Sequence, residues 1–387
     1  MQAFTFSTTK TIINEPGSAR QLGQICQQHG AKSVLIVTDP GIIKVGLLQN
    51  PLSSFTAQGI NVSVYDAVEP DPADTTVLNA VQMAKDMSAD LVVGFGGGSS
   101  MDVAKLVAIL GHPQCQQNLS DLYGVGMAKG PRLPLIQVPT TAGTGSEVTP
   151  IAIVTTGATT KAGVVSPVLQ PDTALLDAEL TVGLPAQVTA ATGIDAMVHA
   201  IEAYTSAHKK NPLSDMLARE ALTLLARNIT TAVTQGDNLE ARSNMLLGAL
   251  LAGQAFANAP VAAVHALAYP LGGHFHIPHG LSNSLVLPHV MRFNADSAHE
   301  LYAQLAPIIM GNDFQPGATE QVTHDLISWL EALIAKVELP NRLRDCQVPE
   351  DFIGQLAADA MEQTRLLVNN PRQVSEQDAF NIYKAAY

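Results

Sequence analysis

A carboxylate and an imidazole lie one helical turn apart near the middle of the chain. Asp195 and His199 occupy positions i and i+4, which places both side chains on one face of a helix. Their neighbours Ile194, Met197 and Val198 are apolar, so we expect this face to be buried. A buried carboxylate must be paired or must coordinate something. The pair is therefore a candidate for half of a metal site.

Histidines are concentrated in a segment that could supply the other half. Six of the 11 histidines lie between His265 and His299, and His265 and His279 occur among apolar residues, glycines and prolines. Imidazole and carboxylate ligands together suit iron, zinc and other first-row divalent ions. One carboxylate with three neutral imidazoles also leaves room for an oxygen ligand, which Lewis-acid catalysis requires. Each histidine taken singly is better explained by a structural hydrogen bond, so the metal hypothesis depends on the whole set.

A run of glycines follows an apolar segment in the first half of the chain. Gly96-Gly97-Gly98-Ser99 connects an expected strand to an expected helix. Glycines allow the backbone to approach an anion closely, and a helix N-terminus offers free N–H groups to a pyrophosphate. The usual dinucleotide motif has a third glycine where Ser99 stands and an acidic residue about 20 positions downstream. An ordinary strand–helix turn is the alternative, but three consecutive glycines favour phosphate binding.

The best candidate for an acidic ribose ligand lies upstream of the glycines. Asp39 ends the expected strand Ser33–Thr38. A carboxylate there can accept both ribose hydroxyls and would repel a 2′-phosphate, which favours NAD over NADP. By itself, an aspartate before Pro-Gly is more often a turn residue. The loop Pro139–Thr149 carries hydroxyls and glycines that could line a phosphate or nicotinamide pocket, although a plain Ser/Thr/Gly loop explains it equally well.

These residues must be positioned by two kinds of structure. Over the first half, mostly apolar strand-like runs alternate with helical patterns, which predicts a parallel sheet covered on both faces. The predicted elements are strands at Ser33–Thr38, Val62–Tyr65, Leu91–Gly94 and Pro134–Val138, a helix at Asp74–Met87 capped by Asp74, and a hairpin of Ile151–Thr155 and Ala162–Val165 around a loop at 157–160.

The character of the sequence changes after Leu184-Pro185, where Ala, Leu and Met predominate with long helical periods. We predict an α/β nucleotide-binding domain at residues 1–184 and an all-helical metal-binding domain at residues 185–387, with the ligand site at their junction. The helices expected in the second domain are Pro212–Ala232, Leu239–Ala257, Ser297–Ile309, Thr319–Val337, Glu350–Asp359 and one near the C-terminus.

Composition narrows the class of protein. The 387 residues include 21 Lys and Arg, 34 Asp and Glu and a net charge of −13, with 47% apolar and only 14% charged residues. This composition excludes a disordered chain and argues against a nucleic-acid partner. The scarcity of charge predicts that part of the surface is buried in a homodimer or larger homo-oligomer. Three scattered cysteines, with no expected secretory signal or membrane span, predict a cytoplasmic location without a membrane partner.

The motifs together resemble those of one family. The chain is similar to the iron-containing (group III) alcohol dehydrogenases over most of its length. This resemblance rests on long, ordered signatures that are far more specific than a lone glycine motif: Gly96-Gly97-Gly98-Ser99 with Asp102 and Lys105, Pro139–Thr149, Thr192–Glu202, and His265 with Pro278-His279-Gly280.

The resemblance implies a metal site, a nucleotide site and a fold. The implied metal ligands are Asp195, His199, His265 and His279, around Fe(II) or, as a frequent substitute, zinc. The implied fold is of the dehydroquinate synthase-like type, an α/β nucleotide domain joined to a helical metal domain, and dimers are common in the family. The implied NAD contacts are Asp39, Gly97, Gly98, Ser99, Asp102, Thr140, Thr141, Thr149 and Lys161.

The chain departs from the family pattern at one position. Many members have a further histidine four residues after the third ligand, where this chain has Tyr269. That histidine is associated with the proton path, so Tyr269 could keep a hydroxyl near the nicotinamide or could fill space, with equal support. His276 is the second candidate for a catalytic role and His274 the third, and a structural role is the safer interpretation of each of these histidines.

The resulting hypothesis is a metal-dependent alcohol dehydrogenase. It would transfer a hydride between a small or medium alcohol or aldehyde and NAD in the cleft between the domains. Phe256, Ile151 and Leu267 are candidates for the apolar walls of the substrate pocket.

Four other functions compete with this hypothesis. A glycerol dehydrogenase-like enzyme typically uses one aspartate and two histidines with zinc, and a maleylacetate reductase-like enzyme depends less on metal, so the four-residue set disfavours both. A dehydroquinate synthase-like lyase would need a basic cluster for a phosphorylated sugar acid, which this acidic chain does not show. A non-enzymatic metal-binding protein would not need the glycine loop or Asp39.

Overall fold

The computed structural model describes residues 3–156 and 160–387. The chain divides into two compact units, a sheet unit at Thr8–Val182 and a helical unit formed by Gly183–Tyr387 with the N-terminal segment that ends at Ser7. That segment is tied to the helical unit because Ser7 N donates to Asn258 Oδ1 at 2.8 Å and Asn258 Nδ2 donates to Ser7 O at 2.9 Å. The unit boundary after Val182 lies two residues before the predicted one. Residues 3–7, the described part of the N-terminal segment, differ from the prediction by joining the helical unit.

The core of the sheet unit is a six-stranded sheet in the order β1-β9-β6-β4-β2-β3, in which every pairing is parallel. The two strands that the sequence did not predict, β1 and β9, are four residues long, and β1 is mostly exposed. β1 carries only two apolar residues, and β9, although its residues are buried, is too short a run to stand out from the surrounding loops. The strands are β1 (Thr11–Asn14), β2 (Ser33–Val37), β3 (Asn61–Tyr65), β4 (Leu91–Gly96), β6 (Leu135–Pro139) and β9 (Thr173–Leu176).

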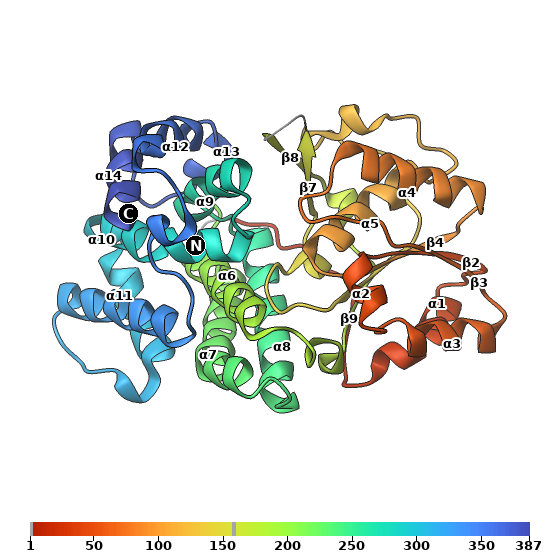
Figure 1. Ribbon diagram of the computed structural model, residues 1–387, viewed down its shortest axis with the longest axis horizontal. Helices are drawn as coiled ribbons and strands as arrows, with labels where there is room; N and C mark the ends of the chain where they lie inside the picture. Colours follow the sequence, from red (N-terminus) through yellow and green to blue (C-terminus); the bar gives the residue numbers. More distant parts are fainter. Residues whose placement is uncertain (1–2, 157–159) are drawn as a thin grey trace. The chain divides into compact units, whose positions relative to one another are not determined.

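Helices cover both faces of this sheet (Figure 1). Leu35 and Val37 of β2 belong to the apolar cluster that includes residues of α4 and α5, whereas Val34 and Ile36 belong to the cluster on the opposite face, with residues of α1 and α3. The alternation follows from the two-residue period of a strand. The helices of this unit are α1 (Leu22–Gln28), α2 (Pro40–Lys44), α3 (Gln49–Gln58), α4 (Asp74–Asp86) and α5 (Gly98–Leu110).

Two details of the sheet unit correct or complete the prediction. Asp74 does not cap α4, because Ala73 occupies the N-cap and Asp74 is the first helical residue, whose carboxylate accepts a hydrogen bond from Tyr123 Oη at 2.6 Å. The predicted hairpin is present as antiparallel β7 (Ile151–Thr156) and β8 (Thr160–Val165), in a separate sheet with β5 (Gly124–Val125). Most of its predicted loop, residues 157–159, lies outside the described residues.

The helical unit contains α6 to α14, which Figure 1 shows in green to blue. Its longest helix, α10, has 32 residues, of which the sequence predicted only the second half. Pro288 interrupts the apolar pattern of the first half, and a proline within a helix removes one backbone hydrogen bond. The helices are α6 (Ala186–Thr205), α7 (Pro212–Thr234), α8 (Leu239–Asn258), α9 (Ala263–Phe275), α10 (His279–Met310), α11 (Thr319–Lys336), α12 (Ile353–Met361), α13 (Thr364–Leu367) and α14 (Glu376–Ala386).

Short 3-10 helices join the longer elements. They lie at Ser18–Gln21, Leu119–Leu122, Ser146–Val148, Pro167–Leu169, Ala178–Thr181, Gly311–Asp313, Leu343–Cys346 and Glu350–Phe352. Within the described residues, no single helix is both long and apolar enough to cross a membrane; α8 and α9 pass that test of length and composition only as a pair, with a bend of 107° between them.

Candidate functional site

Four side chains of the helical unit converge on one point. Asp195, His199, His265 and His279 each present one ligand atom, and these atoms lie within 4.8 Å of one another. Helix α6 supplies the first two, α9 supplies the third, and the first residue of α10 supplies the fourth. The structure thus brings together, from three helices, all of the residues that the sequence suggested as metal ligands.

The distances between the ligand atoms of this cluster fit a bound ion better than direct hydrogen bonds. Asp195 Oδ1 lies 4.0 Å from His265 Nε2 and 3.7 Å from His279 Nε2. Both distances exceed a hydrogen bond, but two ligands that each bind an ion at about 2.1 Å stand up to about 4 Å apart. Nitrogen and carboxylate donors of this kind suit a first-row divalent metal, so the residues present fit such a metal.

The electrostatics of the cluster favour the charged form of its carboxylate. Burial of Asp195 would by itself raise the pKa of the carboxyl group, but His199, His279 and His265 together with a hydrogen bond from Asn283 outweigh burial and hold this pKa below its usual value. The carboxylate is therefore in its metal-binding form at neutral pH.

A glycine allows α10 to bring His279 to this point. A Cβ atom on Gly280 would lie 2.4 Å from the backbone oxygen of Ala191 in α6, far inside van der Waals contact. The first turn of α10 can approach α6 this closely only without a side chain at residue 280. This explains why glycine follows His279 in the sequence motif.

Glu202 contacts one histidine of the cluster, although the sequence analysis did not select it as a site residue. Its Oε2 lies 2.7 Å from His265 Nδ1, and its Oε1 accepts a hydrogen bond from Val264 N at 2.7 Å. A carboxylate on one ring nitrogen fixes the tautomer and directs the other nitrogen, Nε2, toward the metal position. The available signal was its spacing, because Glu202 follows Asp195 by seven residues, two turns along the same buried face of α6.

Asn283 and Phe256 complete the surroundings of the cluster. Asn283 is fully buried, and its Nδ2 donates to Asp195 Oδ1 at 2.6 Å, while its Oδ1 has no hydrogen-bond partner among the described residues. The Phe256 ring stacks on His199 with ring centroids 4.4 Å apart, so the predicted apolar wall residue does border the cluster. Leu267, in contrast, is fully buried, and its backbone oxygen accepts from Tyr383 Oη at 2.6 Å.

The two candidate catalytic residues lie in different settings. Tyr269, one turn after His265 in α9, has its ring centroid 5.9 Å from that of His279. His276 ends α9 in the left-handed conformation, with φ of 53°, and is exposed. Within the described part of the chain, no ring contact or hydrogen bond joins His276 to the cluster. His274 has a structural partner, because its Nε2 lies 2.6 Å from Asp359 Oδ2.

The candidate nucleotide residues lie at one edge of the sheet unit. Asp39 follows β2, Gly97 and Gly98 follow β4, and Thr140 and Thr141 follow β6. These three strands are adjacent and parallel, so their carboxyl ends meet at the same edge. Ligands of open α/β sheets bind at the carboxyl ends of the strands.

Glycine is required at the turn from β4 to α5. Gly96 has φ of 151°, and a Cβ there would lie 2.7 Å from Ser100 Oγ and 3.2 Å from Asp39 Oδ2. Gly97 is the N-cap of α5, so the free N–H groups of this helix begin directly after it. A Cβ on Gly98 would lie 2.9 Å from Thr144 Cγ2. The turn therefore carries both the exposed donors and the close packing that a pyrophosphate site needs.

Asp39 has a structural role, the capping of α2, in addition to its proposed contact with a ribose. Its Oδ1 accepts hydrogen bonds from Gly41 N at 2.8 Å and Ile42 N at 3.1 Å, which makes it the N-cap of α2. The turn interpretation of the Asp-Pro-Gly sequence is therefore correct as far as Oδ1 is concerned. Its Oδ2 faces the glycine turn, since a Cβ atom on Gly96 would lie 3.2 Å from it.

Asp102 and Lys105 tie α5 to the loop that follows β6. The Lys105 ammonium is fully buried and donates to Ser146 Oγ at 2.7 Å, to Thr149 Oγ1 at 3.2 Å and to Ile151 O at 2.5 Å. Asp102 accepts from Ser146 Oγ at 2.6 Å and from Ile153 N at 2.9 Å. Both oxygens of Asp102 thus hold protein groups. The two residues position the loop that carries Thr149.

A second carboxyl group, that of Glu147, is buried beside Asp102 and Lys105. Glu147 is 2% exposed, and burial raises its pKa to about 7, although the charge of Lys105 acts in the opposite direction. Lys161, the last of the proposed cofactor residues, forms an ion pair with Asp71. Lys161 would have to leave that partner, or share it, to contact a nucleotide.

Known proteins match this chain over almost its whole length. Residues 9–178 match the family described as iron-containing alcohol dehydrogenase, and residues 189–387 match the C-terminal part of the Fe-containing alcohol dehydrogenase family. The chain is 42% identical to long-chain-alcohol dehydrogenase 1 of Geobacillus thermodenitrificans, with coverage of 96% of this chain and 93% of that protein. The chain belongs to the iron-containing alcohol dehydrogenase family.

Solved structures support the same assignment. The crystal structure of a 1,3-propanediol oxidoreductase matches with a TM-score of 0.95 at 35% identity, and both chains are covered completely. Sulfoacetaldehyde reductase from Bifidobacterium kashiwanohense, solved in complex with NAD+, matches with a TM-score of 0.87 at 29% identity, covering 100% of this chain and 99% of that one. The predicted fold class, with its parallel-sheet nucleotide part and its helical part, is confirmed.

Family membership establishes the class of reaction. The chain is an enzyme that carries out NAD-dependent oxidation of alcohols and the reverse reduction of carbonyl compounds. The glycerol dehydrogenase-like, maleylacetate reductase-like and lyase alternatives are not favoured by the relatives.

Proposed function

We propose that this enzyme acts on a small or medium alcohol or its aldehyde, with Fe(II) or zinc held by Asp195, His199, His265 and His279. The observation that carries this proposal is the convergence of these four donors within 4.8 Å. When bound, the metal supplies Lewis-acid polarisation of the substrate oxygen, and NAD supplies the hydride acceptor.

The protein's own residues prepare this chemistry in three ways. Glu202 fixes the ring of His265 through Nδ1, and Asn283 fixes the Asp195 carboxylate. Phe256, stacked on His199, keeps one side of the cluster apolar, so water has less access to the reacting atoms. Each contact reduces the rearrangement that the site must undergo during the reaction.

The proposed nucleotide contacts remain those of the sheet edge. The free N–H groups at the start of α5 would receive the pyrophosphate, and Asp39 would accept the ribose hydroxyls and disfavour a 2′-phosphate. Gly97, Gly98, Ser99, Thr140, Thr141 and Thr149 would line this site, while Asp102 would act by holding the loop. Lys161 would contribute only if it leaves Asp71.

The proposed proton path starts at Tyr269. Its ring lies beside that of His279, whereas His276 stands at the exposed end of α9 and would take part only through an intervening group. A Tyr269→Phe variant should shift the pH profile of kcat while the metal content stays constant. An unchanged profile would leave Tyr269 with a packing role.

One experiment tests the proposal as a whole. The enzyme is reconstituted with iron or with zinc, its metal content is measured, and oxidation of straight-chain alcohols of increasing length is followed with NAD and with NADP. We expect about one metal ion per chain, a clear preference for NAD and a maximum at short or medium chain length. Strong NADP preference would refute the role of Asp39, and a maximum at long chains would refute the substrate class.

The assembly and location of the enzyme are also proposals. We propose a cytoplasmic homodimer or larger homo-oligomer, supported by the charged fraction of 14% and by the sparse cysteines, which suit a reducing compartment. Light scattering of the purified enzyme should give at least twice the mass of one chain, and a monomer would contradict this.

A further inference from the structure

The side chain of Asn283 connects three of the four proposed metal ligands. Its Nδ2 donates to Asp195 Oδ1 at 2.6 Å. The same nitrogen lies 3.3 Å from Nε2 of His265 and 3.3 Å from Nε2 of His279. These three ligands come from α6, α9 and α10. One amide group therefore meets a ligand atom from each of the three helices that build the cluster.

The chemistry of these neighbours determines which end of the amide faces them. An ionised carboxylate such as that of Asp195 only accepts hydrogen bonds. His265 Nδ1 lies 2.7 Å from a carboxylate oxygen of Glu202, so the ring proton is on Nδ1 and Nε2 carries a lone pair. An amide oxygen turned toward these atoms would meet only acceptors. The N–H groups of Asn283 therefore face the ligands.

The other end of this amide shows that stability of the fold does not by itself explain the asparagine. Asn283 is fully buried, and its Oδ1 has no hydrogen-bond partner among the described residues, which is unfavourable. Asn294, on the same helix and 3% exposed, has both ends of its amide satisfied, because it exchanges hydrogen bonds with Asn370 at 3.0 and 2.7 Å. The contacts of Nδ2 with the ligands are thus the feature that requires an asparagine at position 283.

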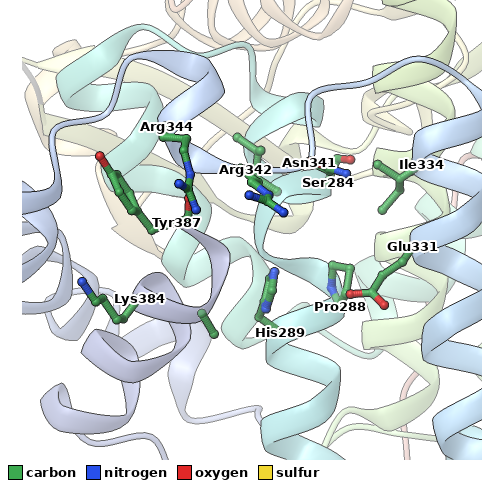
Figure 2. Close-up of a pocket in the computed structure, with 12 residues that line it drawn as sticks. Ser284, Pro288, His289, Glu331, Ile334, Asn341, Arg342, Arg344, Lys384 and Tyr387 are labelled. Atoms are coloured by element: carbon green, nitrogen blue, oxygen red, sulfur yellow. The ribbon is translucent and has the colours of Figure 1, made fainter.

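Asn283 lies on the face of α10 that carries His279, since it follows that ligand by four residues. Figure 2 shows Pro288 and His289, further along α10, on the wall of a separate cavity of about 410 Å³ that residues of α11 and the end of α14 also line. Asn283 and the four ligands are not among the described residues that line this cavity. The amide therefore belongs to the ligand cluster.

Binding of an ion would affect the contacts of Asn283 unequally. A carboxylate oxygen has two lone pairs, so Asp195 Oδ1 can bind an ion and still accept a hydrogen bond from Asn283. A neutral imidazole nitrogen has one lone pair, so His265 and His279 must release the amide when they bind an ion. The contacts of Asn283 with the two imidazoles therefore act before an ion binds, whereas its contact with Asp195 acts before and after.

We propose that Asn283 is a positioning residue that preassembles the metal site, because it holds Asp195, His265 and His279 in their ligand positions before the ion binds. This inference rests on the proposed four-residue ligand set. Without the amide, Asp195 Oδ1 could close its distance of 3.7 Å to His279 Nε2 and bind that imidazole directly, which would occupy two ligand atoms. Fewer molecules would then be competent to bind metal, and apparent affinity falls with the competent fraction.

Zinc exchange in the full chain tests this proposal. Uptake of zinc by the metal-free enzyme is timed with a fluorescent zinc indicator, and release is timed after addition of excess chelator. Asn283→Leu keeps the size of the side chain and Asn283→Ala leaves space, and both lack the N–H donors, so either one serves if the other does not fold. We expect zinc affinity to fall by about tenfold or more. Most of this loss should appear as slower uptake, because the ligands must first be brought together.

Matched variants separate this role from a merely structural one. Asn294→Leu and Asn294→Ala make the same changes at a buried asparagine of α10 outside the cluster. Urea unfolding should show that they lower stability, whereas their zinc uptake should equal that of the unmodified chain. The proposal is overturned if the Asn283 variants take up zinc as fast as the unmodified chain, or if the Asn294 variants slow uptake equally. If the unmodified chain itself binds neither zinc nor iron, the four-residue site fails and this inference fails with it.

Discussion

The candidate metal cluster and the candidate nucleotide site are built from different parts of the polypeptide. In the helical unit, four side chains from three helices supply every donor atom. In the sheet unit, the expected donors at the turn from β4 to α5 are backbone N–H groups, and side chains such as Lys105 act by holding loops. A site made of side chains should lose its ligand when one of those side chains is removed. A site made of backbone groups should lose its ligand when the side chains that hold the backbone in place are removed.

The largest expected effect follows the loss of one donor. His279→Ala should retain little metal and lose nearly all turnover, because a metal site with one ligand fewer binds much more weakly. The His279 side chain is 40% exposed, so the fold should survive its removal. Elemental analysis and NAD reduction measure the two effects. His276→Ala, at an exposed histidine outside the cluster, is the control for metal content, and full metal retention in His279→Ala would refute the ligand assignment.

The corresponding experiment in the sheet unit removes Lys105, a side chain that holds the loop after β6 in place. Lys105→Met should destabilise this unit by about 3 kcal/mol, because it leaves the nearby Asp102 and Glu147 carboxyl groups without their buried counter-charge. It should also raise KM for NAD while metal content stays constant. Denaturant unfolding and steady-state kinetics measure the two effects. Lys85→Met, at an exposed lysine of α4, is the control. An unchanged KM for NAD in Lys105→Met would show that the loop after β6 keeps its position without the contacts of Lys105.

A support can also be removed from the metal cluster. Glu202→Gln should lower metal affinity by about 10-fold to 100-fold, because it weakens the orientation of His265. Competition with a chelator measures this affinity without reference to turnover. Glu300→Gln, at an exposed position of α10, should leave the affinity unchanged. An affinity in Glu202→Gln equal to that of the control would mean that packing alone orients His265.

Nucleotide choice can be separated from helix capping at Asp39. Asparagine is as good an N-cap as aspartate, so Asp39→Asn should preserve the start of α2 while removing the negative charge near the ribose site. We expect the ratio of NADP to NAD use to rise by about tenfold, since one repulsive interaction with the 2′-phosphate is lost. Ratios of kcat/KM for the two cofactors measure the change, and a constant ratio would place the ribose elsewhere.

A further effect depends on pH and involves Glu147. Because burial raises the pKa of this group to about 7, the folded state binds its proton more tightly than the unfolded state does. Stability therefore decreases as pH rises from the ordinary carboxyl range through about 7. Glu147→Gln should be more stable than the unmodified chain at pH 8, by on the order of 2 kcal/mol, and nearly equal to it at pH 4.5. Urea unfolding at both pH values tests this, and equal stability at pH 8 would contradict it.

Much of the fold could be predicted because its signals are local. Strand β2 is a continuous run of apolar residues, and α7 and α8 have helical periods that the prediction located to within two residues. Strand β1 and the first half of α10 escaped prediction for physical reasons. Most of β1 is exposed, so apolar residues are not required there. In α10, Pro288 interrupts the apolar pattern that would indicate a helix, and packing against neighbouring helices stabilises the helix despite this proline.

The sequence by itself determined the donor types, the one-turn spacing of Asp195 and His199, and the glycine turn, because these depend on residue identity and short-range geometry. Only the tertiary structure decided that α9 and α10 bring their histidines to the same point, since this requires the close approach of Gly280 to α6. It also decided that Glu202 directs His265 and that Asp102 holds a loop. Contacts between residues distant in sequence are selected by packing, and packing has no short-range signature in the chain.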